Sequence, residues 1–280
     1  PEARQPALFG LRIQIINGVS PAFADCSIDA RPAAPTMYYL NRRFNLGLQE
    51  YDELSPESVI NTLTEALIFL FPNTLSTLEP ASEGAAPELE LRTYFEHAGI
   101  LLGRPKKGSP CRLGVALKGG HNNEHHNHND VGTYVVVLGE RALLLDPGSE
   151  VYTARTFSSR RYESNLLNSY GHPVPVVAGK LQRTGSEARA EVLRTEFSEA
   201  QDLFALDLKA AYDVPELTKL ERTFVYSREG QGSLTVTDRV EYSQPQTFET
   251  ALLTLGQWEL LEATSLLVYD AQEAVRVDVE

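Results

Sequence analysis

The sequence predicts a mainly β protein, in which a large antiparallel β-sandwich follows a short α-helical segment. Helical spacing of apolar residues, with helix start and stop signals, occurs only before residue 78 of this 280-residue chain. From residue 91 onward, short apolar runs alternate with polar turns, and no helical pattern separates them. We therefore expect a helical segment at 1–77, a linker at 78–90 and a β-sandwich domain at 91–280.

Two stretches of the N-terminal segment have helical periodicity. In residues 34–48, Met37, Leu40 and Phe44 fall on one face. Residues 55–71 begin with a serine and a proline, which suit the N-cap and the first helical position, and apolar residues follow at helical spacing. Both stretches are therefore expected to be helices.

The remainder of the chain reads as a linker followed by strands. Residues 78–90 are rich in Pro, Ala, Gly and Glu without periodicity, which is typical of a linker. Residues 131–148 form two apolar runs around Gly139-Glu140, which predicts a hairpin with a two-residue turn. Residues 220–242 alternate and are interrupted by "REGQG", which predicts a second hairpin. Four further short strands are expected in "AEVLRTEF", "DLFALDLKAAY", "TFETALLTLG" and "AVRVDVE".

Charge and hydropathy exclude two classes of partner. The net charge of −13 argues against nucleic acid, and no apolar run is long enough to span a membrane. The distribution of charge is uneven, because residues 91–185 contain 12 Lys and Arg against 7 Asp and Glu. An anionic ligand is therefore compatible with this part of an otherwise acidic chain.

The two cysteines and the first residues leave the cellular compartment open. Cys26 and Cys111 are far apart and outside any CxxC pattern, so we expect buried thiols, with a single disulfide as the alternative. The chain begins "PEARQPALFG", without an initiator Met or a leader pattern, so we expect a processed chain or a fragment.

Four of the six histidines lie within "GGHNNEHHNHND", residues 119–130. If "HNHND" is extended, its period of two places His126, His128 and Asp130 on one face. Neutral imidazoles and carboxylates bind Zn²⁺ and related ions. The alternative is a polar turn without a metal. A cupin-type site fits poorly, because the Glu that should follow the HxH pair is missing.

Two residues further along the chain are candidates to join this cluster. Asp146 ends the second strand of the first hairpin, and His172 follows a glycine where the chain is expected to turn. With a tight turn at 139–140, Asp146 pairs opposite Gly132 or Thr133, too far along a straight strand to share an ion with His128. A common site therefore requires that the segment before Asp130 folds back, which its glycines and asparagines allow.

Several motifs together resemble the heparinase II/III-like family of polysaccharide lyases, in particular its C-terminal β-sandwich region. They are "KGGHNNEHHNHNDVGTYVV", "LLLDPG", "YTARTFSSRRYES" and "NSYGHPVPVV". The resemblance extends from about Tyr94 to the end of the chain. The upstream helices look like the last part of the family's (α/α) toroid.

The resemblance implies a role for most of these histidines. His128, Asp146 and His172 match the family's Zn²⁺ ligands, and His126 matches its active-site histidine. These lyases cleave uronic-acid glycans by β-elimination, and their zinc is thought to hold the histidine loop in place. The family's catalytic tyrosine lies on the toroid, upstream of this sequence, so the chain is expected to contain half of an active site.

Charged and aromatic residues near the motif are candidates for binding substrate. Arg155, Arg160 and Arg161 can match a uronate carboxylate with two hydrogen bonds each, and Tyr152 can stack on a sugar ring. The alternatives are ordinary surface arginines and a half-buried tyrosine of a sheet. Asp130 is expected to orient a histidine rather than to bind the metal.

Two functional hypotheses follow. In the first, the chain is part of a polysaccharide lyase, whose partners are an anionic polysaccharide and the upstream toroid of the same protein. In the second, it is a non-catalytic, zinc-stabilised β-sandwich that binds acidic glycan or a helical partner domain.

Overall fold

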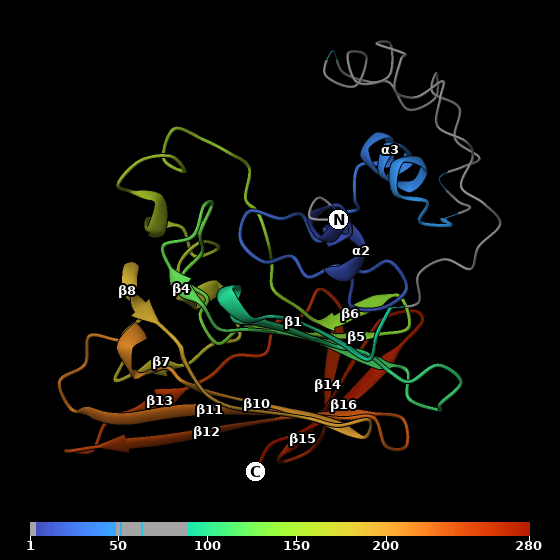
Figure 1. The fold of residues 1–280 in the computed structure, drawn as a ribbon. Coiled ribbons are helices and arrows are strands. Elements are labelled where there is room, and N and C mark those ends of the chain that lie inside the picture. Colours follow the sequence, from blue (N-terminus) through green and yellow to red (C-terminus); the bar gives the residue numbers. More distant parts are fainter. Residues whose placement is uncertain (1–3, 49–50, 52–62, 64–88) are drawn as a thin grey trace. The chain divides into compact units, whose positions relative to one another are not determined.

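The computed structural model describes residues 4–48, 51, 63 and 89–280 (Figure 1). The chain divides into two compact units, of which unit 1 contains Pro1–Ile13 and Arg31–Glu90 and unit 2 contains Gln14–Ala30 and Leu91–Glu280. The expected helix at 55–71 and nearly all of the expected linker lie outside the described residues.

The described part of unit 1 is helical. Its helices are α1 (Arg4–Ala7), α2 (Phe9–Arg12) and α3 (Ala34–Phe44). The helix expected in residues 34–48 therefore ends four residues early, because Asn45 adopts a left-handed conformation with φ of 49°. Met37 is buried in a small apolar cluster, against which Leu40 and Phe44 pack, as their helical spacing predicted.

Unit 2 consists of antiparallel sheets. The five-stranded sheet has the order β1-β2-β3-β5-β6, with β1 (Arg92–Phe95), β2 (Ile100–Gly103), β3 (Leu113–Lys118), β5 (Tyr134–Leu138) and β6 (Arg141–Leu144). The four-stranded sheet has the order β12-β11-β10-β9, with β9 (Glu191–Phe197), β10 (Gln201–Asp207), β11 (Leu217–Ser227) and β12 (Ser233–Tyr242). Smaller sheets pair β4 (His121–Asn122) with β8 (Gly185–Arg189), β7 (Val176–Val177) with β13 (Phe248–Glu249), and β14 (Gln257–Glu262), β15 (Ser265–Tyr269) and β16 (Ala274–Asp278) with one another.

The two larger sheets enclose the main hydrophobic core. Leu117 and Tyr134 of the five-stranded sheet share this core with Phe204 and Phe224 of the four-stranded sheet. The rings of Tyr134 and Phe224 meet edge to face across it, with centroids 6.0 Å apart. The alternation of burial along β11 and β12 is that of strands with one face on a core. The predicted mainly β fold with helices at its N-terminal end is confirmed.

Residues 14–30 belong to the β unit, whereas the sequence grouped them with the helical segment 1–77. Every residue of β3 is buried, so its outer face is covered as well as its inner face. A Cβ atom on Gly114 would meet the side chains of Ile15 and Ile16, and Arg104 donates a hydrogen bond to the carbonyl oxygen of Gln14 at 3.0 Å. The stretch packs on the five-stranded sheet without forming a helix, which is why periodicity gave no sign of it.

The two predicted hairpins are confirmed, and one predicted strand is largely wrong. Leu138 pairs with Arg141 around the turn at 139–140, and Ser227 pairs with Ser233 around "REGQG". In "TFETALLTLG", in contrast, only Phe248 and Glu249 form a strand.

Both cysteines are unpaired thiols in the structure. Cys111 is buried as expected, whereas Cys26 is only partly buried. Among the described residues, no helix is long and apolar enough to cross a membrane.

A buried arginine joins the sandwich to the loops beside it. Arg222 of β11 is 1% exposed, and it binds both carboxylate oxygens of Asp238, each at 2.7 Å. Its Nη1 also donates to the carbonyl oxygens of Gly132, at 2.9 Å, and Pro173, at 2.7 Å. Removing the guanidinium would leave a carboxylate and two carbonyl groups without their donor.

We therefore expect Arg222→Met to lower the free energy of unfolding by about 3–5 kcal/mol, the usual cost of breaking a buried ion pair. Urea denaturation of the purified protein measures this change. The matched control is Arg239→Met on β12, because Arg239 is 66% exposed and its pair with Glu241 lies at the surface. That variant should change the stability by no more than about 0.5 kcal/mol. Equal losses in the two variants would contradict the role assigned to Arg222.

Candidate functional site

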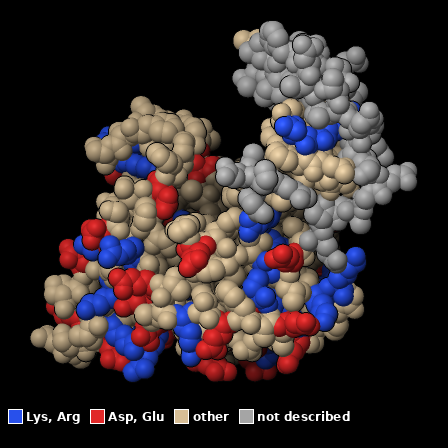
Figure 2. Space-filling model, viewed as in Figure 1, with Lys and Arg blue, Asp and Glu red and all other residues tan. Residues whose placement is uncertain are grey.

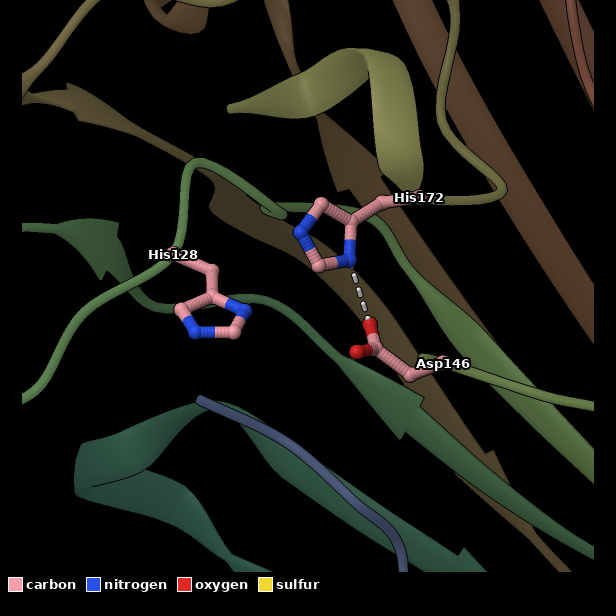
Figure 3. Close-up of side chains that lie close together, drawn as sticks. All are labelled: His128, Asp146 and His172. Atoms are coloured by element: carbon pink, nitrogen blue, oxygen red, sulfur yellow. Dashed lines mark hydrogen bonds and ion pairs between the residues drawn. The ribbon is translucent and has the colours of Figure 1, made fainter. Parts of the chain in front are cut away.

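Three side chains from distant parts of unit 2 converge in a buried group (Figure 3). His128 lies in the loop between β4 and β5, Asp146 follows β6, and His172 follows a short 3-10 turn at Ser169–Gly171. One potential ligand atom from each residue lies within 4.8 Å of the others. All three residues have no exposed surface. The group can bind a metal ion.

The loop that carries His128 folds back, as a shared site required. The amide of Thr133 donates to the carbonyl oxygen of Asp130, and Gly132 adopts a φ of 90°, so the chain turns tightly just before β5. His126 has a φ of 58°, which is uncommon for a residue with a side chain. "HNHND" is therefore not extended, and the condition for His126, His128 and Asp130 to share one face is not met. His126 points outward with 55% of its side chain exposed, whereas His128 and Asp130 are buried.

Hydrogen bonds fix part of the buried group and leave two nitrogen atoms without partners. His172 Nδ1 lies 2.7 Å from Asp146 Oδ2, which also accepts from Thr133 Oγ1 at 3.1 Å. In the part of the chain that the structure describes, neither His128 Nδ1 nor His172 Nε2 has a hydrogen-bond partner. A buried polar atom without a partner is costly. Bound metal would satisfy such atoms, and two imidazoles with one carboxylate are a donor set that suits zinc and related ions.

The protonation of the group also suits a metal. Burial lowers the pKa of His128, which favours the neutral imidazole that binds metals. Burial opposes the charge on His172, but the adjacent Asp146 carboxylate outweighs it and raises the pKa of His172. Burial likewise opposes ionisation of Asp146, yet His172 holds the pKa of this carboxyl below its ordinary value. A metal ion on His172 Nε2 would take the place of the second proton of this imidazole and leave the hydrogen bond from Nδ1 to Asp146.

Asp25 is a central residue that the sequence did not reveal. Its carboxylate is 3% exposed and lies 2.7 Å from Arg161 Nη2 and 2.9 Å from both His128 Nε2 and His126 Nδ1. Burial opposes its ionisation, but the hydrogen bonds from Arg161 and the two histidines lower its pKa from 3.8 to about 2. Asp25 stands in a stretch without a regular pattern, more than 100 residues from both histidines. No sequence signal marks it.

Aromatic side chains surround the exposed histidine. The ring of Tyr152 stacks on His126 with centroids 6.3 Å apart, and Phe157 meets both rings edge on. The Tyr152 hydroxyl donates to Asp25 at 3.1 Å. The loop around these residues, yellow-green in Figure 1, presents mainly uncharged residues on the face shown in Figure 2. Tyr152 is 49% exposed, so another ring can stack on it, and Phe157 is a neighbour that the sequence did not suggest.

The family model described as "Heparinase II/III-like, C-terminal" matches residues 94–266. The chain belongs to the heparinase II/III-like family. This confirms the resemblance seen in the motifs. Asp25 lies upstream of the matched residues.

Solved structures with the same fold carry related titles. A heparinase III gene product has 16% sequence identity to this chain and a TM-score of 0.62. The matched region includes 92% of this chain and 35% of the heparinase III chain. A heparan sulfate lyase HepC mutant from Pedobacter heparinus has 15% identity and a TM-score of 0.61, with 95% of this chain covering 38% of that one. This heparinase II/III-like chain thus spans little more than a third of the length of those structures. No curated protein sequence matches it.

Three predicted arginines of this heparinase II/III-like domain already bind carboxylates of the same chain. Arg155 pairs with both oxygens of Glu150, at 2.8 and 2.7 Å. Arg161 binds Asp25 and two backbone carbonyl groups, and it is mostly buried. Arg160 is exposed and pairs with Glu163 three residues away. Of the three, Arg160 is the most accessible to a substrate.

The contact with a histidine that was expected of Asp130 is made by Asp25. Asp130 is buried and forms an ion pair with the ammonium group of Lys118, and among the described residues it has no hydrogen bond to a histidine. The carboxylate that binds a histidine of the buried group from outside is Asp25, through His128 Nε2. Spacing along one strand suggested Asp130, but the tight turn directs that residue toward β3.

We expect the purified protein to bind one divalent metal ion per chain at His128, Asp146 and His172. His128→Ala removes one of the three ligands and should reduce the metal content to well under one ion per chain. His125→Ala is the matched control, since His125 is an exposed histidine of the same loop, and it should keep the full content. Elemental analysis after removal of loosely bound metal measures both. Equal metal content in the two variants would contradict the site.

Proposed function

We propose that this chain is part of a polysaccharide lyase that cleaves uronic-acid-containing glycans by β-elimination and contains a structural zinc ion. The observation that carries the proposal is the arrangement of two histidines of one loop in a heparinase II/III-like domain. His128 belongs to a buried group that suits a metal, and His126 stands two residues away at the surface. The titles of the similar structures, heparinase III and heparan sulfate lyase, support the same class of reaction.

In this reaction a base removes the proton next to the uronate carboxylate, and the bond to the glycosidic oxygen breaks. The leaving oxygen takes up a proton, and a double bond forms in the sugar ring. Imidazole suits such proton transfer near neutral pH. We assign this proton transfer to His126 Nε2, because the other ring nitrogen, Nδ1, contacts Asp25 and Tyr152.

Binding of the substrate is assigned to the surface around His126. Tyr152 can stack on a sugar ring, and Arg160 can exchange Glu163 for a uronate, since exposed ion pairs contribute only about 0–1 kcal/mol. Arg155 and Arg161 contribute positive charge behind this surface, but each holds a carboxylate of the chain. A helical toroid of the same protein would supply the other wall of the cleft and the proton donor.

The proposed zinc ion would be held by His128, Asp146 and His172 and would join three segments that lie far apart in the sequence. We expect a chelator and His128→Ala to lower the Tm by similar amounts. The expected fall in Tm is about 5–10 °C. It corresponds to a loss of about 2.5 kcal/mol of stability, since each kcal/mol shifts the Tm of a domain of this size by about 2–4 °C. Calorimetry measures both. Loss of all lyase activity on chelation at an unchanged Tm would show that the metal takes part in the chemistry instead.

The lyase activity itself is tested in a protein that contains these 280 residues together with a helical toroid domain. We expect it to release 4,5-unsaturated product, detected by ultraviolet absorbance, from at least one uronate glycan. His126→Ala should lower its turnover by about 10²–10⁴-fold, the usual loss on removal of one proton-transfer group, with unchanged metal content. His125→Ala should keep the activity.

The 280-residue chain alone should bind metal and release no unsaturated product. Full activity of the short chain would assign the proton donor to its own residues, with Tyr152 as the candidate closest to His126. Binding of acidic glycan without cleavage by the longer protein would favour a non-catalytic module.

A further inference from the structure

The carboxylate of Asp25 contacts both histidines of the loop, one with each oxygen. Oδ1 lies 2.9 Å from His128 Nε2 and 2.7 Å from Arg161 Nη2. Oδ2 lies 2.9 Å from His126 Nδ1 and 3.1 Å from the Tyr152 hydroxyl. One nearly buried side chain therefore stands between the candidate metal ligand and the candidate proton-transfer group.

These contacts define which ring nitrogen carries the proton. The ion pair with Arg161 keeps Asp25 charged, and a charged carboxylate only accepts hydrogen bonds. His128 must then donate from Nε2 and His126 from Nδ1. In the neutral ring the other nitrogen keeps its lone pair. This leaves His128 Nδ1 as the ligand atom that faces Asp146 and His172, as Figure 3 shows, and His126 Nε2 as the atom available to a substrate.

The backbone around Asp25 is anchored on unit 2. The carbonyl oxygen of Cys26 accepts a hydrogen bond from the amide of Ser149 at 3.0 Å, three residues after Asp146. On the other side, the ring of Phe23 lies under the ammonium group of Lys118, 5.7 Å from its centroid. The segment around Asp25 is thus anchored on the end of β3 and on the loop that follows Asp146, both of which come much later in the chain.

The ring of His126 is held in place by contacts with other segments of the chain, among them the hydrogen bond to Asp25. Its φ of 58° is a left-handed conformation that a residue with a side chain rarely adopts, and it persists only where the surroundings hold it. More than half of its side chain is exposed, so packing alone does not fix the ring. The hydrogen bond to Asp25 orients it, together with the rings of Tyr152 and Phe157.

We propose that Asp25 is a positioning residue that serves both parts of the site at once, orienting His128 for the metal and His126 for the substrate. This proposal rests on the proposed function, from which the roles of His128 in metal binding and of His126 in catalysis are taken. The placement and tautomer of both rings are independent of that function. Asp25 also extends the site beyond the matched family region, to a segment that covers the outer face of the five-stranded sheet.

The test uses ¹⁵N-histidine-labelled protein and proton–nitrogen correlation spectra that report which ring nitrogen is protonated. In Asp25→Asn, one carboxylate oxygen becomes an amide group. If the remaining oxygen keeps Arg161 and His128, the amide donates to His126 Nδ1, and the proton of His126 moves to Nε2. We expect this change of tautomer in the metal-free protein. Zinc affinity, measured by competition with a chelator, should fall by about 10–100-fold, because the group that orients His128 changes from a charged carboxylate to a neutral amide, whose oxygen is a weaker acceptor.

The matched control is Asp202→Asn. Asp202 is a buried carboxylate that also binds a different group with each oxygen, here Arg92 and Arg228, and within the described part of the chain it forms no hydrogen bond with a histidine. This variant should lose stability and keep both the zinc affinity and the histidine spectra. Asp25→Glu is the second variant in case Asp25→Asn does not fold. It keeps the charge beside Arg161 but displaces both oxygens, and we expect it to weaken zinc binding and shift the signals of both histidines.

Unchanged zinc affinity together with unchanged His126 and His128 signals in the Asp25 variants would overturn the proposal, as would the same changes in Asp202→Asn. Failure of the wild-type protein to bind zinc would instead contradict the metal site of the proposed function. In that case the spectra of the metal-free protein still decide the role of Asp25. Absence of lyase activity affects neither measurement.

Discussion

The buried guanidinium of Arg222 connects the sandwich to two of the loops that carry the site. From the core-facing strand β11 it reaches the carbonyl oxygens of Gly132, in the turn after the histidine loop, and Pro173, next to His172. Asp238 neutralises its charge with two hydrogen bonds. A buried cation must be fully paired to be tolerated, so the positions of both loops are coupled to the register of β11 and β12. The site is thereby built on the rigid part of the unit although its residues lie in loops.

The sequence predicted those parts of the fold that have a local period. The strands β11 and β12 alternate and their turn is polar, so both were recognisable. Residues 14–30 have no period, because they cover a sheet in an irregular conformation, and they were wrongly grouped with the helices. The boundary between the two units therefore depends on a tertiary contact, that of Ile15 and Ile16 with Gly114, which no pattern reports.

In the site, too, residues that belong to a sequence motif were predicted, whereas a residue that depends on a tertiary contact was not. His128, Asp146 and His172 were predicted because family motifs carry them, and the structure brings them together. A carboxylate partner for a histidine was expected on chemical grounds, but spacing pointed to Asp130, which binds Lys118 instead. The residue that fills this role, Asp25, comes from a segment outside the motif. Chemistry predicted the kind of group, and only the folded chain could supply its position.

The positive balance of residues 91–185 also has a different meaning in three dimensions. Arg155 is paired with Glu150 and Arg161 with Asp25, so the charges of both arginines are neutralised within the chain and are not available to a ligand. Breaking the mostly buried pair of Arg161 and Asp25 would be costly, because it would leave the Asp25 carboxylate poorly hydrated and without its cation. The pair of Arg160 and Glu163 is exposed, so Arg160 can exchange Glu163 for a ligand carboxylate at little cost. A count of charges along the sequence therefore overestimates the groups that remain for a substrate.

Burial divides the histidine loop into a dry part and a wet part. His128 has no exposed surface and its unpaired nitrogen faces other buried groups, which suits an ion that stabilises the fold and exchanges slowly with solvent. His126, two residues earlier, is 55% exposed, which suits a group that must meet a substrate. An extended strand would have placed both on the same face. The left-handed turn at His126 separates them, and the single carboxylate of Asp25 then holds the two rings in a fixed relation to each other.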